Sequence, residues 1–498
     1  MAPWTSSSPP VMALAVALML CGLPAGALPV SPDVDRCVNG DHTLKCCPTP
    51  SGKQIIDFTQ PPPPTTLRVR RPAHSLNPKA AANYAKAIAA MRELPPDHPW
   101  NFLQQSNVHC AYCSGGHRQA GTNISLEIHG SWLFFPWHRA YLYFYERILG
   151  KLAGDPSFAL PFWNWDHPDG MSVPAIYRDP SSPLYNPTRY PQTLNFTNIG
   201  CEGDVGKGLE KQKQCNLRLM HRQFAAASDT AELFLGGQYR KGDTDAPGGG
   251  VLEGVPHNPI HVSTGSDMSL LRTSGRDPLF IAHHANMDRL WSIWQSTSGG
   301  GRTKSFHDPD FLNASFVFWD ENMQRVRIRV RDCIDARMQL NYYYEDVPNL
   351  WLNMKTEVEQ VVADNRMRPR SIEPEVNFPA VLGSSITVEV RRTPGVEGQK
   401  LIVGGIEFDR GAKVWFDVYV GSARGDGRRV TARAAAGCFV HMWSSAGASE
   451  GSTMSTELRL GIREFVEAIG AAGDDTVVVT LVPKIGGDMV TIGRVWIE

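Results

Sequence analysis

The chain contains 498 residues, has a formal net charge of −1 at pH 7, and draws 20% of its residues from Asp, Glu, Lys and Arg. A chain of this length exceeds what a single hydrophobic core usually holds, so we expect two or three domains. Because positive and negative charges are balanced and mixed, the composition indicates no nucleic-acid partner and no membrane-surface partner.

Residues 1–27 are typical of a leader segment. They carry no charged side chain, and an apolar run from Val11 to Leu23 is followed by the small residues at 25–27. Such a run is too short to span a bilayer, and the pattern predicts a signal peptide that is removed. Three Asn-x-Ser/Thr sequons are compatible with the secretory route and predict a glycoprotein: Asn123, Asn195 and Asn313.

Residues 28–99 read as an N-terminal arm with little core of its own. Prolines at 61–64 predict an extended polyproline segment, and the Ala-rich stretch from Pro78 to Leu94 predicts a helix. An arm of this kind needs covalent anchors, and it holds three of the ten cysteines of the chain: Cys37, Cys46 and Cys47. This use of cysteine fits an oxidising compartment.

Histidines suited to metal binding gather in two places within a predicted helical domain, residues 100–345. The first group consists of His109 in HCAYC and of His129 and His138 in LEIHGSWLFFPWHR. Pro136 stands just before the last of these, and proline is poorly tolerated inside a helix. We therefore expect His129 on an irregular lead-in and His138 on the helix that follows.

The second group begins with His257 and His261, which are four residues apart and would share one face of a helix. The Asp-Pro pair at 277–278 predicts an N-cap and a proline at the first position of another helix. That helix carries the adjacent residues His283 and His284. Neighbouring helical residues point about 100° apart, so we expect one of the two, and not both, to reach a metal.

Two triads made only of histidine indicate two metal ions, each with an open coordination position. Neutral imidazole suits zinc, copper, iron and nickel. A dinuclear hydrolase would usually add a bridging or water-orienting carboxylate, and the nearby acids are Glu253 and Asp277, of which the second is better explained as a helix cap. Six neutral ligands favour a pair of coppers that cycles between Cu(I) and Cu(II) and binds oxygen.

The remaining segments read as loops, a linker and strands. The stretch 166–250 is rich in Pro, Gly and Asn, which predicts long loops lining the site. Residues 346–374 read as a linker whose part from Asp364 to Pro374 is open to proteases, because it has Arg and Pro but no apolar periodicity. Alternating apolar residues in SITVEV, KVWFDVYV, DTVVVTLV and MVTIGRVWI predict a β-sandwich over 375–498.

Several of these motifs resemble those of one family. HCAYC, SWLFFPWHR, ALPFWNWD, HNPIH and DPLFIAHHANMDRLW are similar to the type-3 copper motifs of plant polyphenol oxidases, the catechol oxidase and tyrosinase family. DVPNLWLN (Asp346–Asn353) and KVWFDVYV (Lys413–Val420) resemble two further family marks. The resemblance implies a mainly α catalytic domain, with a four-helix bundle around a dicopper site, and a C-terminal β-sandwich that shields it.

The same resemblance assigns roles to individual residues. Six histidines would bind two copper ions: His109, His129 and His138 at copper A, and His257, His261 and His284 at copper B. His284 is chosen over His283 because it matches the family pattern. Phe280 would pack over the copper B imidazoles. The implied covalent links are a thioether between Cys113 and His129 and the disulfides Cys37–Cys47 and Cys46–Cys110.

The implied activity is the oxidation of o-diphenols to o-quinones with reduction of O2 to water. Glu253 and Asn258 match an acid and an amide that would hold a water as base for monophenol hydroxylation, and Leu271 matches the gate residue. Phenolic small molecules and O2 would be its partners, together with a protease that activates a latent proenzyme at the linker. Two alternatives are a specialised biosynthetic phenol oxidase similar to aurone synthase and an O2 carrier similar to haemocyanin.

The leader departs from the family pattern. Many family members carry a long plastid transit region and a twin-arginine signal, and residues 1–27 show neither. We therefore expect a vacuolar or extracellular location, with the thylakoid lumen as the alternative.

Overall fold

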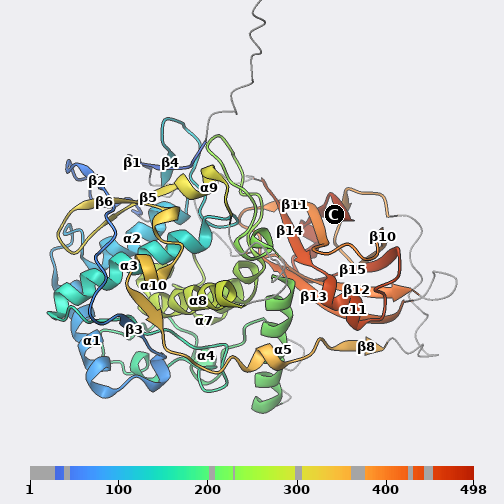
Figure 1. Ribbon diagram of the computed structural model, residues 1–498, viewed down its shortest axis with the longest axis horizontal. Helices are drawn as coiled ribbons and strands as arrows, with labels where there is room; N and C mark the ends of the chain where they lie inside the picture. Colours follow the sequence, from blue (N-terminus) through green and yellow to red (C-terminus); the bar gives the residue numbers. More distant parts are fainter. Residues whose placement is uncertain are drawn as a thin grey trace, which may run out of the picture.

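The computed structural model describes residues 28–38, 45–200, 208–227, 230–297, 306–360, 376–423, 430–441 and 453–498. Within these ranges a helical domain is followed by a domain of antiparallel sheets, and the two lie side by side (Figure 1). This arrangement confirms the predicted fold class. None of the helices in the described ranges is both long and apolar enough to cross a membrane.

In the described part of the chain, the helical domain contains five helices of twelve or more residues and several shorter ones. The long ones are α1 (Pro78–Glu93), α2 (Phe102–Cys113), α3 (Phe134–Ala153), α5 (Leu209–Ala226) and α8 (Leu279–Ser296). The shorter ones are α4 (Pro191–Asn195), α6 (Ala231–Leu235), α7 (Asn258–Thr264), α9 (Pro309–Asn313) and α10 (Ala336–Gln339). Helix α3 is buried along almost its whole length and packs against α1 and α8. The aromatic run that it carries therefore forms core, and it holds the metal-binding helices in place.

The prediction of loops over residues 166–250 is wrong in part, because α5 (Leu209–Ala226) lies within it. Leu217, Met220 and Phe224 follow one another at helical spacing and are buried. That periodicity marks an amphipathic helix, and the high Pro, Gly and Asn content of the surrounding segments hid it. Helix α5 stands between the helical domain and the sheets (Figure 1).

The N-terminal arm is tied to the helical domain by short strands. In the described residues β1 (Pro32–Cys37) pairs with β4 (His117–Gln119), and β3 (Arg68–Arg70) pairs with β7 (Tyr342–Tyr344). A third small sheet has the order β2 (Ile55–Asp57), β6 (Arg325–Arg329) and β5 (Ser315–Trp319), so that β2 pairs with β6. Arg70 is fully buried, with Nε 2.8 Å from Glu146 and its guanidinium 3.7 Å from the Tyr342 ring centre. A buried charge needs such partners, so the arm is fixed at this point.

The described residues of the C-terminal domain form two sheets. One has the order β10 (Ile386–Arg391), β15 (Thr476–Ile485), β12 (Trp415–Ala423), β13 (Val430–Val440) and β8 (Val358–Gln360). The other has the order β14 (Thr453–Gly461), β11 (Lys400–Asp409), β16 (Thr491–Ile492) and β9 (Ala380–Val381), with β17 (Arg494–Ile497) also paired to β11. Helix α11 (Arg463–Ala468) completes the domain. Phe416, Val418 and Val420 alternate into its core, as the sequence pattern predicts.

Candidate metal centre

The first histidine group is assembled by α2, α3 and the turn before α3. His109 lies on α2, His138 lies on α3, and His129 precedes α3 on an irregular segment, as the position of Pro136 predicts. Their ring centres are 5.3 to 5.7 Å apart. Cys113 lies in the same cluster, whose potential ligand atoms are all within 4.8 Å of one another.

The second group is assembled by α7 and α8. His257 ends a π-helical turn (Glu253–His257) and His261 lies on α7. His283 and His284 lie on α8, at whose start Asp277 Oδ1 accepts a hydrogen bond from Leu279 N at 2.9 Å. The structure brings both adjacent histidines into the cluster, in which the potential ligand atoms are again within 4.8 Å of one another. Distance alone therefore does not choose between them.

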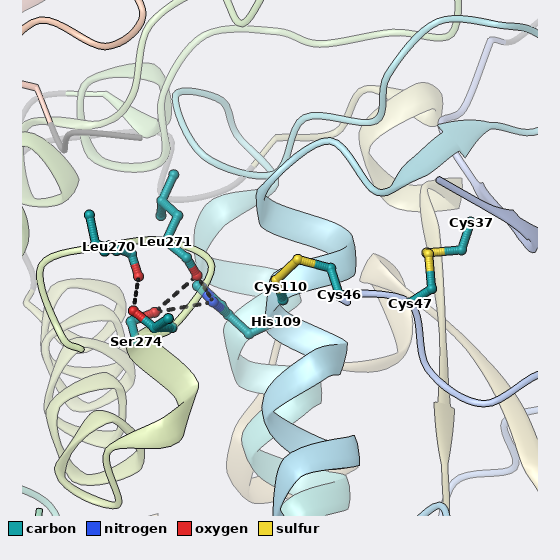
Figure 2. The surroundings of a disulfide bond; sticks show 9 residues. Cys37, Cys46, Cys47, His109, Cys110, Leu270, Leu271 and Ser274 are labelled. Atoms are coloured by element: carbon teal, nitrogen blue, oxygen red, sulfur yellow. Dashed lines mark hydrogen bonds between the residues drawn. A yellow bond between two sulfur atoms is a disulfide. The ribbon is translucent and has the colours of Figure 1, made fainter. Parts of the chain in front are cut away.

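Backbone carbonyls fix the protonation of four of these imidazoles. Nδ1 lies within hydrogen-bond distance of a carbonyl oxygen in His109 (Leu271, 3.0 Å), His138 (Phe134, 2.8 Å), His257 (Glu253, 3.2 Å) and His261 (Met268, 2.8 Å). A carbonyl oxygen only accepts, so Nδ1 carries the proton and Nε2 keeps its lone pair. Figure 2 shows this contact for His109. Among the described residues, Nε2 of His109, His138 and His257 is buried and has no hydrogen-bond partner.

Burial also keeps these imidazoles neutral. Desolvation lowers the pKa of His129 to about 3 and that of His261 to about 4, and it places the pKa of His109, His138 and His257 well below the usual value. Neutral rings with unpartnered inward nitrogens are the form that binds a metal. The residues present therefore fit a pair of ions that prefer imidazole.

The predicted disulfides and the packing aromatic lie next to the first group. The structure pairs Cys37 with Cys47 and Cys46 with Cys110, and Cys110 adjoins His109 on α2 (Figure 2). The Phe280 ring centre is 4.3 Å from that of His284 and 4.7 Å from that of His109. Phe280 thus packs between the two groups. Cys201, a further cysteine of the chain, lies outside the described residues.

A cavity of about 540 Å³ adjoins the histidines, and both domains line it. The helical domain contributes Glu253, Asn258 and Leu271, and the C-terminal domain contributes Phe439 and Val440 of β13, among others. Glu253 is buried, which raises its pKa to about 8, and its Oε1 accepts a hydrogen bond from Gly130 N at 2.7 Å. Its Oε2 has no partner among the described residues.

Asn258 links the metal site to the C-terminal domain. Its Oδ1 lies 2.8 Å from His257 Nδ1, and its Nδ2 donates to the Val440 carbonyl at 2.7 Å. Sequence reasoning gave Asn258 a role but did not predict this contact. It also missed Trp165, whose Nε1 donates to His283 Nδ1 at 3.0 Å. Trp165 lies in the motif ALPFWNWD, and this motif is the sequence signal that could have identified it as a residue of the site.

Three regions of the chain match known families. Residues 99–297 match the common central domain of tyrosinase, residues 305–357 the polyphenol oxidase middle domain, and residues 378–498 the chloroplastic polyphenol oxidase C-terminal domain. The polyphenol oxidase of Malus domestica is 43% identical over 515 residues, covering 95% of this chain and 85% of that protein. The chain belongs to the plant polyphenol oxidases of the tyrosinase family. It is therefore an enzyme, and its two histidine clusters are consistent with a dinuclear type-3 copper centre.

Other relatives of this polyphenol oxidase agree with that assignment. Aureusidin synthase of Antirrhinum majus is 43% identical over 500 residues, covering 94% of this chain and 88% of that protein. Latent apple tyrosinase superposes with a TM-score of 0.78 at 41% identity, covering 89% of this chain and 99% of that one. Latent aurone synthase superposes with a TM-score of 0.85 at 34% identity, covering 94% and 99%.

The predicted vacuolar or extracellular location is wrong. Relatives from Malus domestica, Vitis vinifera and Vicia faba are chloroplastic polyphenol oxidases, and the matching C-terminal domain is the chloroplastic one. These findings support the plastid instead. The prediction was wrong because it depended on a short uncharged apolar run and on sequons, and both are weak signals of location. The apolar run, from Val11 to Leu23, lies outside the described residues.

Proposed function

We propose that this polyphenol oxidase converts o-diphenols to o-quinones at two coppers held by six histidines: His109, His129 and His138, and His257, His261 and His284. The observation that carries the proposal is the gathering of neutral imidazoles in two clusters, in which Nε2 of four proposed ligands has no hydrogen-bond partner among the described residues: His109, His129, His138 and His257. When bound, the copper pair supplies O2 binding and electron transfer, so that two catechols and one O2 give two quinones and two waters. His284 Nε2 lies 3.2 Å from His261 Nε2, as expected of two ligands of one ion.

His129 needs a different anchor from the other ligands. Neither of its ring nitrogens has a hydrogen-bond partner among the described residues, so no backbone carbonyl fixes the orientation of its ring. Cys113 lies in the same cluster and is buried. A thioether between Cys113 and His129 would hold this imidazole during redox cycling, in the role that the carbonyl contacts play for His109 and His138.

The cavity wall supports a role for three further residues. Leu271 lines the cavity as the gate, and its carbonyl is the group that orients His109. Glu253 and Asn258 line the same cavity, and Glu253 keeps one carboxyl oxygen without a partner. Together they can hold one water near the second histidine group. That water would take the proton that a monophenol must lose before it binds copper.

Replacing Asn258 tests this water-holding role. General-base assistance is worth on the order of a hundredfold or more, so in linker-cleaved protein Asn258→Gly should lower tyramine hydroxylation at least about tenfold. Catechol needs no such base, and its oxidation should change by no more than about twofold. Ser263→Gly, on the same helix but away from the cavity, is the matched control and should leave both rates unchanged. Equal losses for tyramine and catechol would refute the role.

A second candidate function is the oxidation of one specialised phenolic metabolite. Aureusidin synthase and (+)-larreatricin hydroxylase match this chain at 43% and 39% identity, close to the values for general polyphenol oxidases. A substrate panel separates the two candidates: a general oxidase turns over many simple diphenols at similar rates, whereas a specialised one turns over a single phenol class. The matches to these enzymes give the O2-carrier alternative no support.

A further inference from the structure

The second histidine group contains one imidazole more than the proposed ligand set. The His283 ring centre is 4.8 Å from that of His261, 5.3 Å from that of His257 and 5.0 Å from that of His284. These distances are as short as those among the proposed ligands themselves, where His261 and His284 are 5.3 Å apart. A ring so placed is near enough to compete for the metal, and something other than distance must exclude it.

The hydrogen bond from Trp165 supplies that exclusion. The indole Nε1–H is only a donor, so the His283 Nδ1 that it contacts at 3.0 Å must be the acceptor. Both side chains are fully buried, so bulk water does not compete for this contact. A neutral imidazole carries one proton, and in His283 that proton is therefore on Nε2. This is the reverse of His109, His138, His257 and His261, whose Nδ1 atoms face carbonyl oxygens.

We infer that Trp165 is a positioning residue that prevents His283 from becoming a copper ligand. Binding through Nδ1 is blocked because the indole N–H already occupies that lone pair. Binding through Nε2 would require the proton to move to Nδ1, where it would face the indole N–H and leave two buried donors without an acceptor. The ring is thus held within reach of the metal in a form that does not bind it.

The consequence for the reaction is an open position. A metal site that performs catalysis keeps a coordination position free for its substrate. A fourth imidazole at copper B would fill the position that O2 and the phenol need. This inference depends on the proposed ligand set, in which His284 binds and His283 does not, and it adds the residue that enforces the choice.

Copper content of the full-length chain tests the inference independently of activity. His284→Ala should retain about one copper per chain instead of two. Trp165→Phe combined with His284→Ala frees the His283 lone pair, so the second copper should return, to nearly two per chain. Trp163→Phe combined with His284→Ala is the matched control: Trp163 Nε1 donates to the carbonyls of Gly170 and Ser172 at 2.9 and 3.0 Å, and its loss should restore nothing.

The outcomes separate this inference from the function on which it depends. If His284→Ala alone keeps both coppers, the ligand set is wrong. If it loses one and the Trp165→Phe double variant stays near one, or if the Trp163→Phe control recovers copper equally, the role of Trp165 is refuted.

A measurement on the unmodified chain guards against misfolding of the variants. In ¹⁵N-histidine NMR spectra of the metal-free protein, the signals of His283 are identified as those that disappear in His283→Gln. These signals should show an unprotonated Nδ1 and a protonated Nε2. A protonated Nδ1 in that ring would overturn the inference.

Discussion

His284→Ala should lose one of two coppers and abolish catechol oxidation, whereas His283→Ala should keep both coppers. The mutated histidines are neighbours on α8 and both are fully buried, so the two changes remove the same volume from the same helix. They differ in the hydrogen bonds of the two rings: His284 Nε2 lies 3.2 Å from His261 Nε2, while His283 Nδ1 accepts from Trp165. Copper should therefore be lost only when the replaced histidine is a ligand, and not merely because a side chain of this size is removed.

The expected size of the effect follows from metal-site energetics. Losing a residue that merely orients a ligand typically costs about 10- to 100-fold in metal affinity, so losing a ligand costs more. Metal analysis and catechol oxidation, measured on the same linker-cleaved samples, check both variants. His167→Ala is the control, because His167 contacts Asp169 and lies in neither cluster. The opposite pattern, with copper lost from His283→Ala and kept by His284→Ala, would overturn the ligand assignment.

Cleavage of the linker should raise activity towards bulky diphenols about tenfold or more. This size corresponds to a full-length chain in which the C-terminal domain leaves the site open for about one-tenth of the time or less, because the rate falls in proportion to the open fraction. The reason is the shared cavity: Phe439 and Val440 of the C-terminal domain line it, and Val440 accepts a hydrogen bond from Asn258. The predicted protease target, Asp364 to Pro374, lies outside the described residues. Oxygen uptake before and after trypsin treatment measures the change, and equal rates would show that the domain does not shield the site.

The ion pairs between the domains provide a test of shielding without a protease. Arg410 lies 3.3 Å from Asp245 and 3.7 Å from Glu127, and Arg459 lies 3.2 Å from Glu232. Each such partly exposed pair contributes on the order of 1 kcal/mol or less, so Arg410→Ala combined with Arg459→Ala should raise full-length activity severalfold. Arg463→Ala is the control, because its pairs with Glu397 and Glu467 stay within the C-terminal domain.

Local sequence signals predicted the parts of the site that depend on spacing and backbone chemistry. The four-residue spacing of His257 and His261 predicts one shared face, and Pro136 predicts that His129 precedes the helix; the structure shows both. The alternation in KVWFDVYV predicts the buried side chains of β12. These features follow from helix and strand periodicity, which the chain expresses over a few residues.

Contacts between distant segments could not be predicted in this way. The bond from Trp165 to His283 joins residues 118 positions apart, and the bond from Asn258 to Val440 joins residues 182 positions apart. Both depend on how helices and domains pack, which no local pattern encodes. Helix spacing predicted that only one of His283 and His284 would approach the metal, yet both rings lie in the cluster, and a hydrogen bond distinguishes them.

The most direct test of the central claim is the stoichiometry of oxygen consumption by the linker-cleaved, copper-loaded protein with catechol. The proposed reaction predicts irreversible uptake of one O2 for every two catechols, with quinone formed in equal amount to the catechol lost, and no uptake after copper is removed. Reversible oxygen binding without quinone formation, or uptake that survives complete copper removal, would contradict it.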